Sequence, residues 1–80
     1  MTMDKAVRER ILELCREQDY TINKLAKLSK IAPSPLQEFI NGTRNNIRIP
    51  TVYKICEAFD ISIYDFFNTN DFKNLEQEIR

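Results

Sequence analysis

The sequence predicts an all-α domain of five short helices followed by a short C-terminal helical tail. Three observations support this prediction. Apolar residues recur at helical spacing along the chain, they never alternate with polar residues over a useful strand length, and helix start and stop signals interrupt the pattern. Because 80 residues can bury only one small core, we expect a single domain over residues 1–67 and a tail over residues 68–80.

Residues 4–18 are expected to form the first helix. Four apolar side chains share one stripe of this segment, and charged side chains such as Arg8 occupy the rest of its surface. The stripe consists of Val7, Ile11, Leu14 and Cys15. This pattern is typical of a helix that packs one side against a core.

Two short helices separated by a tight break are expected over residues 22–29 and 33–41. Thr21 is a good N-cap for the first, because its hydroxyl can accept a hydrogen bond from an unpaired amide. Pro33 suits the first turn of the second, which an Asn-Gly pair ends. Within the break the chain must reverse direction at Lys30, so we expect this residue either to adopt a left-handed backbone, at a cost of about 1 kcal/mol relative to glycine, or to shift the turn.

A polar loop over residues 41–48 leads to a fourth helix, whose first turn Pro50 marks and in which apolar residues again repeat at helical spacing. Ser62 is placed to cap a fifth helix over residues 63–67. The core residues expected in this fifth helix are Ile63, Phe66 and Phe67.

Charge is distributed unevenly, although the 12 basic and 12 acidic residues cancel. Residues 20–54 contain six basic side chains and one acid, a net charge of +5, between acidic ends. Such a block favours an electropositive face that binds a polyanion, although scattered solvated lysines would produce the same count.

Composition disfavours several functional classes. No segment approaches the roughly 20 apolar residues that span a bilayer, and no apolar leader follows the N-terminus, so we expect a cytoplasmic protein without a membrane partner. The chain has no histidine, and Cys15 and Cys56 occupy apolar helical positions, so we expect no metal site, cofactor or disulfide. Without histidine the usual general base is missing, which disfavours an enzyme, and no small-molecule ligand is indicated.

The two helices within residues 21–41 have the helix-turn-helix pattern. Ala26 is small enough for the helices to cross closely, Ile31 can fill the turn, and Leu36 can anchor the second helix. With the residues that follow, this pattern resembles the lambda-repressor-like, Cro/XRE-type family of helix-turn-helix transcriptional regulators from about Val7 to Phe67. The resemblance rests on Thr21, Leu25, Ala26, Ile31, Leu36, Asn41, Gly42, Arg44, Asn46, Thr51 and the run 55–67.

The resemblance implies the five-helix fold of that family and sequence-specific binding to double-stranded DNA, with helix 33–41 in the major groove of an operator and the chain acting as a repressor. The residues that it places at base-contacting positions are Pro33, Ser34, Gln37 and Glu38. Those that it places at DNA-backbone-contacting positions are Thr21, Asn41, Thr43, Arg44, Asn45 and Arg48. Amides, hydroxyls and guanidinium groups suit base edges and phosphate oxygens in these roles.

Three departures from the family pattern support an alternative hypothesis. Lys30 stands where the family usually has glycine, Pro35 falls inside the recognition helix, and Glu38 would face a groove lined with phosphates. The alternative is a protein-interaction module on the same fold, such as an antirepressor or an antitoxin-like partner, with weakened DNA binding.

The tail contains a further apolar stripe formed by Phe72, Leu75 and Ile79. Because one recognition helix covers only one half of a twofold DNA site, we expect a homodimer that associates through this stripe. The alternative is that the stripe folds back onto its own domain, where it would add burial to a small core.

Overall fold

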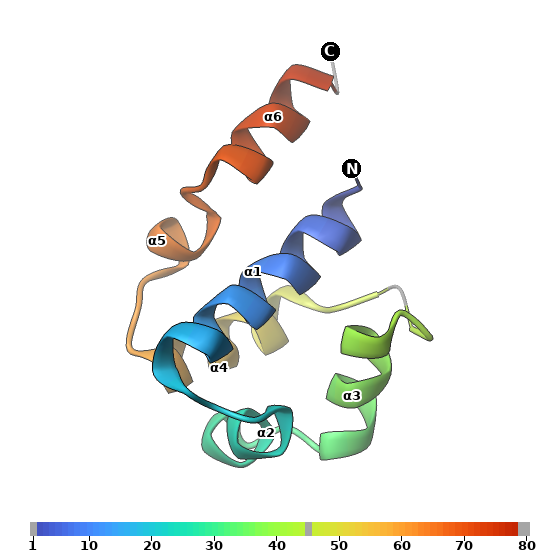
Figure 1. The fold of residues 1–80 in the computed structure, drawn as a ribbon, viewed down its shortest axis with the longest axis vertical. Coiled ribbons are helices and arrows are strands. Elements are labelled where there is room, and N and C mark those ends of the chain that lie inside the picture. The colour runs from blue at the N-terminus through green and yellow to red at the C-terminus, as the bar shows by residue number, and fades with distance from the viewer. Residues whose placement is uncertain (1, 45, 79–80) are drawn as a thin grey trace.

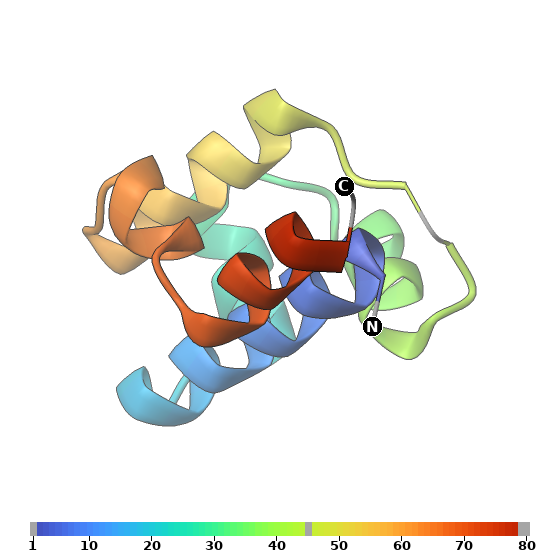
Figure 2. The same ribbon diagram turned by 90° about the horizontal axis from the view of Figure 1, so that it is seen from above.

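The computed structural model describes residues 2–44 and 46–78, and every element within these ranges is a helix. The helices are α1 (Met3–Gln18), α2 (Ile22–Ser29), α3 (Pro33–Asn41), α4 (Ile49–Phe59), α5 (Ile63–Phe67) and α6 (Asn70–Glu78). In Figure 1, α1 crosses the middle of the molecule, α2 and α3 form one end, and α6 lies at the other. Figure 2 shows α6 running alongside α1. The all-α prediction is confirmed.

Short polar side chains begin three of these helices. The hydroxyl oxygens of Thr2, Thr21 and Ser62 each accept a hydrogen bond from the backbone N–H three residues later, at 3.2, 3.0 and 3.0 Å. Pro33 and Pro50 lie in the first turns of α3 and α4, where a missing N–H removes no intrahelical bond. The predicted helix starts at Thr21, Pro33 and Ser62 are therefore confirmed.

Within the described residues, four helices end on a residue with a left-handed backbone. These residues are Asp19, Lys30 and Asp60, each with a φ of 59°, and Gly42, with a φ of 84°. At the end of α2, the Ile31 N–H donates to the Ala26 carbonyl oxygen at 3.0 Å, which satisfies a carbonyl group that the helix leaves unpaired. The left-handed turn predicted at Lys30 is confirmed, so a lysine occupies the position that glycine would adopt without strain.

The apolar stripes of the helices meet in one core. Its largest enclosed side chains are Phe39, Phe66, Ile11, Leu25, Ile55, Val52 and Cys56. Both cysteines are buried and free, and burial raises the pKa of the Cys15 and Cys56 thiols. They therefore act as packing residues, as their helical positions predicted. Within the described part of the chain, no helix is long and apolar enough to cross a membrane.

The prediction that Ile63 belongs to the core is wrong. Its side chain is 38% exposed, whereas Phe66 is fully buried and Phe67 half-buried. A helix of five residues makes little more than one turn, so it can bury only one narrow stripe of side chains. Ile63 lies outside that stripe, next to the exposed Tyr64.

The apolar stripe of the tail folds back onto the domain, which corrects the expectation that it serves self-association. Phe72 and Leu75 are buried in the same core as the five preceding helices, and α6 contacts α1. Ile79 lies outside the described residues. Burial against the chain's own helices removes the two described stripe residues from the available surface.

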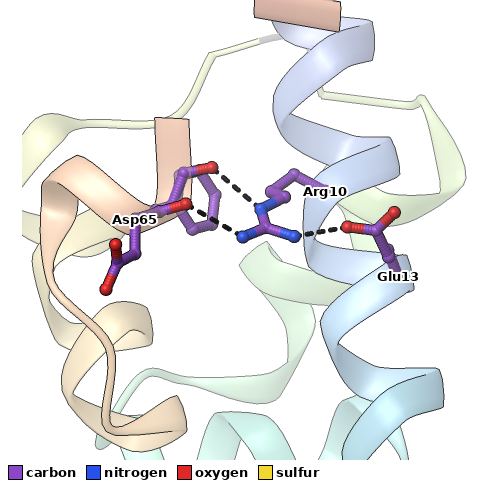
Figure 3. A network of polar contacts seen from close by, with 4 residues as sticks. Arg10, Glu13 and Asp65 are labelled. Carbon is purple, nitrogen blue, oxygen red and sulfur yellow. Dashed lines mark hydrogen bonds and ion pairs between the residues drawn. The ribbon is translucent and has the colours of Figure 1, made fainter. Parts of the chain in front are cut away.

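Arg10 joins α1 to α5, as Figure 3 shows. Its Nε donates to the Phe66 carbonyl oxygen at 2.8 Å, its Nη2 donates to the Asp65 carbonyl oxygen at 2.9 Å, and its Nη1 pairs with the Glu13 carboxylate. Both carbonyl groups lie at the C-terminal end of α5, where unpaired oxygens and the helix dipole favour a cation. Arg10 therefore fixes the place of this short helix against α1.

Candidate nucleic-acid interface

The helix α3 has one apolar and one polar side. Leu36 and Phe39 point into the core and are buried, and Ile40 is half-buried. Ser34, Gln37 and Asn41 are exposed, and Glu38 is partly exposed. The Gln37 side-chain amide donates a long hydrogen bond of 3.4 Å to the Asn41 Oδ1, which aligns these two polar groups along the helix. The polar side thus presents hydroxyl, amide and carboxylate groups to solvent.

The helix α2 packs against α3 on the side opposite its polar face. Leu25 and Ala26 of α2 are completely buried, and α2 and α3 contact each other at the end of the molecule opposite α6 (Figure 1). Ile31 in the turn is half-buried against the core, as the packing argument predicted. The small Ala26 side chain lets the two helices approach closely, so α3 is held with its polar side outward.

Prolines shape the start of α3. Ala32 precedes the helix without a side-chain capping bond, and Pro33 and Pro35 both lie within the first turn. Of the first three residues of α3, only Ser34 therefore has a backbone N–H that can bind an anion. The helix continues unbroken through Pro35, because amides in the first turn have no intrahelical acceptor to lose.

The loop after α3 folds back onto Glu38. The backbone N–H groups of Thr43 and Arg44 both donate to the Glu38 carbonyl oxygen, at 2.9 and 3.1 Å. The Arg44 Nη2 also lies 3.7 Å from the Glu38 Oε2, with both side chains about half exposed. At this exposure the ion pair contributes at most about 1 kcal/mol, so it orients Arg44 without holding it tightly.

The remaining predicted backbone-contacting residues lie on helix ends and in the loop. The Thr21 oxygen accepts the capping bond from the Lys24 N–H, and its hydroxyl proton stays available to a second acceptor. Asn41 and Thr43 are exposed around the left-handed turn at Gly42, and Arg48 is the exposed residue that precedes α4. Asn45 lies outside the described residues.

All six basic side chains of the central charged block are exposed. They are Lys24, Lys27, Lys30, Arg44, Arg48 and Lys54. The Lys24 Nζ lies 4.7 Å from the centre of the Tyr20 ring, and the single acid of the block, Glu38, pairs with Arg44. Lys54 lies on α4, and the other five lie on or directly after α2 and in the loop after α3, so this end of the molecule carries exposed basic groups.

Sequence reasoning missed one residue beside the interface. It placed Arg8 on the charged surface of the first helix, but the structure half-buries this side chain and joins it to α3. Arg8 directly follows the stripe residue Val7, and a long side chain at the border of an apolar stripe can bury its stem. The position of Arg8 at the border of the apolar stripe was therefore the sequence signal that could have indicated its partial burial.

Known proteins are similar to this chain in sequence and in fold. The sequence profile of the Cro/C1-type HTH DNA-binding domain matches residues 10–71. A protein of Bacillus subtilis (strain 168), the SPbeta prophage-derived uncharacterized HTH-type transcriptional regulator YopS, is 32% identical over 57 residues, which are 71% of this chain and 77% of that protein. The crystal structure of the prophage Lp1 protein 11 matches with a TM-score of 0.79 and 31% identity, covering 89% of this chain and 93% of that one.

Proposed function

The chain belongs to the Cro/C1-type helix-turn-helix family and is an HTH-type DNA-binding transcriptional regulator, and on this premise we propose that it is a repressor that binds a twofold-symmetric operator as a homodimer. The observation that carries the proposal is the exposed polar side of α3, bounded by the arginine-containing loop. A helix that exposes amide and hydroxyl groups beside phosphate-binding cations suits the major groove.

Base contacts would come from the outward side of α3. The side-chain amide of Gln37 can form two hydrogen bonds with adenine. Ser34 offers a hydroxyl group, and Pro33 offers an apolar surface for a thymine methyl group. Glu38 could accept a hydrogen bond from a cytosine amino group once Arg44 has turned from it to a phosphate. The half-exposed pair between these two side chains supports such an exchange, because little energy holds it closed.

Backbone contacts would come from groups on either side of α3. Arg44 and Arg48 would pair with phosphates from the loop, and Thr21, Asn41 and Thr43 would donate uncharged hydrogen bonds. All five are exposed. Asn45 is proposed on the family resemblance alone.

Dimerisation would use α5. Ile63 and Tyr64 are 38% and 73% exposed, and two adjacent apolar side chains of this size form a small surface suited to a second copy of the chain. The buried Phe72 and Leu75 cannot serve in their place. A dimer would place two α3 helices about one DNA turn apart, and it would repress by excluding other proteins from the duplex it covers.

The interaction-module hypothesis gains no support from the three departures that suggested it. Lys30 adopts the left-handed turn in place of glycine, Pro35 leaves α3 unbroken, and Glu38 pairs with Arg44. None of them displaces α3 or covers its polar side.

Selection of bound fragments from a random duplex pool tests the proposal. Regulatory regions of prophages are added to the pool, because the two similar proteins described above carry prophage names. We expect enrichment of a twofold-symmetric sequence and binding that weakens steeply with salt. Tyr64→Glu should abolish the dimer in sedimentation and leave half-site binding in place. Absence of both enrichment and salt-dependent binding would favour the interaction module instead.

A further inference from the structure

Arg8 of α1 holds the C-terminal end of α3. Its Nε donates to the Phe39 carbonyl oxygen at 2.7 Å, and its guanidinium carbon lies 5.0 Å from the centre of the Phe39 ring. The last turn of α3 contains no basic residue of its own. Arg8 therefore supplies, from another helix, the cation that the carbonyl end of a helix favours.

The helix α3 has few other directional attachments. Its start has no side-chain cap, and only Leu36 and Phe39 are buried along its length. Among the side chains that the structure describes, no other hydrogen bond or ion pair joins α3 to another helix. Apolar contacts alone tolerate small rotations, whereas a charge-assisted hydrogen bond constrains direction.

The surroundings of Arg8 do not favour a purely stabilising role. Among the side chains that the structure describes, its Nη2 is buried without a hydrogen-bond partner, and a buried donor without a partner lowers stability. The guanidinium instead links α1, the longest described helix, to the backbone of Phe39. Phe39 lies two residues after Gln37.

We propose that Arg8 is a positioning residue for α3: it sets the orientation in which Ser34 and Gln37 meet the bases, and so controls discrimination between DNA sequences more than affinity for DNA in general. This inference rests on the proposed function. Arg8 acts through Phe39 and makes no contact with DNA itself.

The chain offers a matched control. Arg10 lies on the same helix and also donates from Nε to a phenylalanine carbonyl oxygen, but it holds α5 in place of α3 (Figure 3). Arg8→Met and Arg10→Met each remove the charge and the donors while keeping a long apolar stem. Arg8→Lys keeps the cation beside Phe39 and serves as the rescue variant. Arg8→Gln carries the same tests if Arg8→Met does not fold.

The first measurement uses the free protein and needs no DNA. The Gly42 N–H donates to the Phe39 carbonyl oxygen and the Thr43 N–H to that of Glu38, so amide hydrogen exchange at these two groups reports on the end of α3. We expect Arg8→Met to raise the exchange rate of these amides at least fivefold and Arg10→Met to leave the rate within twofold of the wild-type value. Arg8→Lys should restore the wild-type rate. Unchanged exchange in Arg8→Met would overturn the proposal.

The second measurement is the ratio of affinities for a selected duplex and a random duplex. Arg8→Met should lower this ratio about tenfold, the loss expected when one bidentate base contact is misplaced, while affinity for the random duplex stays within twofold. Equal losses on both duplexes would show a merely structural role and overturn the inference. A wild-type protein that binds neither duplex would instead refute the proposed function, and the exchange measurement would still stand.

Discussion

The ring of Phe72 meets the ring of Phe67 edge to face, with centroids 4.8 Å apart and planes at 69°. A second contact, to Phe66, has a centroid distance of 6.3 Å. These contacts place the first turn of α6 against α5, while the rest of the helix follows α1 (Figure 2). The tail is therefore part of the core of the domain.

Phe72→Ala should lower the free energy of unfolding by about 3–5 kcal/mol, because it removes a large buried ring and leaves a cavity. Urea denaturation monitored by circular dichroism measures the change. Lys73→Ala alters the exposed neighbouring residue and should change stability by no more than about 0.5 kcal/mol. A chain truncated after Asn68 that kept wild-type stability would contradict this account of the tail.

Lys30→Gly should raise the free energy of unfolding by up to about 1 kcal/mol, because glycine adopts the left-handed backbone at this position without steric cost. Thermal melting gives the sign of the change. Lys27→Gly is the control, since the same substitution in the last helical turn should cost about 1 kcal/mol. If both variants are destabilised alike, the turn is not a source of strain.

Arg44→Ala and Arg48→Ala should each weaken binding to all DNA sequences about equally and lower the salt slope of the binding constant by about one unit. Affinities on one random and one selected duplex, titrated over a range of salt, supply both values. Lys73→Ala makes the same charge change on α6 and should leave the slope nearly unaltered. If both arginine variants kept the wild-type salt slope, the loop would not contact the DNA phosphates as proposed.

Gln37→Ala should relax the preference at one base pair of each half-site and leave non-specific affinity intact, because the bidentate amide contact with adenine provides about 1–3 kcal/mol of discrimination. Repeating the fragment selection with the variant shows which position is lost. Gln18→Ala replaces an exposed glutamine at the end of α1 and should give the wild-type consensus. An unaltered consensus for Gln37→Ala would count against its role.

Much of the fold could be predicted because its signals are local. Caps such as Thr21 and Ser62, the proline at the start of α3 and the left-handed turn at Lys30 act through hydrogen bonds or backbone strain within one helical turn. The division of α3 into a buried and an exposed side also follows from helical spacing. These features depend on near neighbours in the chain.

The contacts that orient α3 and α5 could not be predicted in this way. Arg8 and Arg10 donate to carbonyl groups 31 and 56 residues away, and their acceptors are backbone atoms that every residue type carries. No residue pattern marks which carbonyl oxygen a guanidinium will reach. The pairing of Glu38 with Arg44 likewise required the turn at Gly42 to bring the loop back onto α3.

The sequence by itself thus determined the helices, several of their ends and the outward residues of α3, because short-range spacing and capping specify them. Only the tertiary structure decided that Phe72 and Leu75 enter the core while Ile63 stays exposed. All three are apolar residues at helical spacing, so pattern alone cannot rank them. Which of them is buried depends on the surface that the other helices leave uncovered, and that surface exists only after the chain has folded.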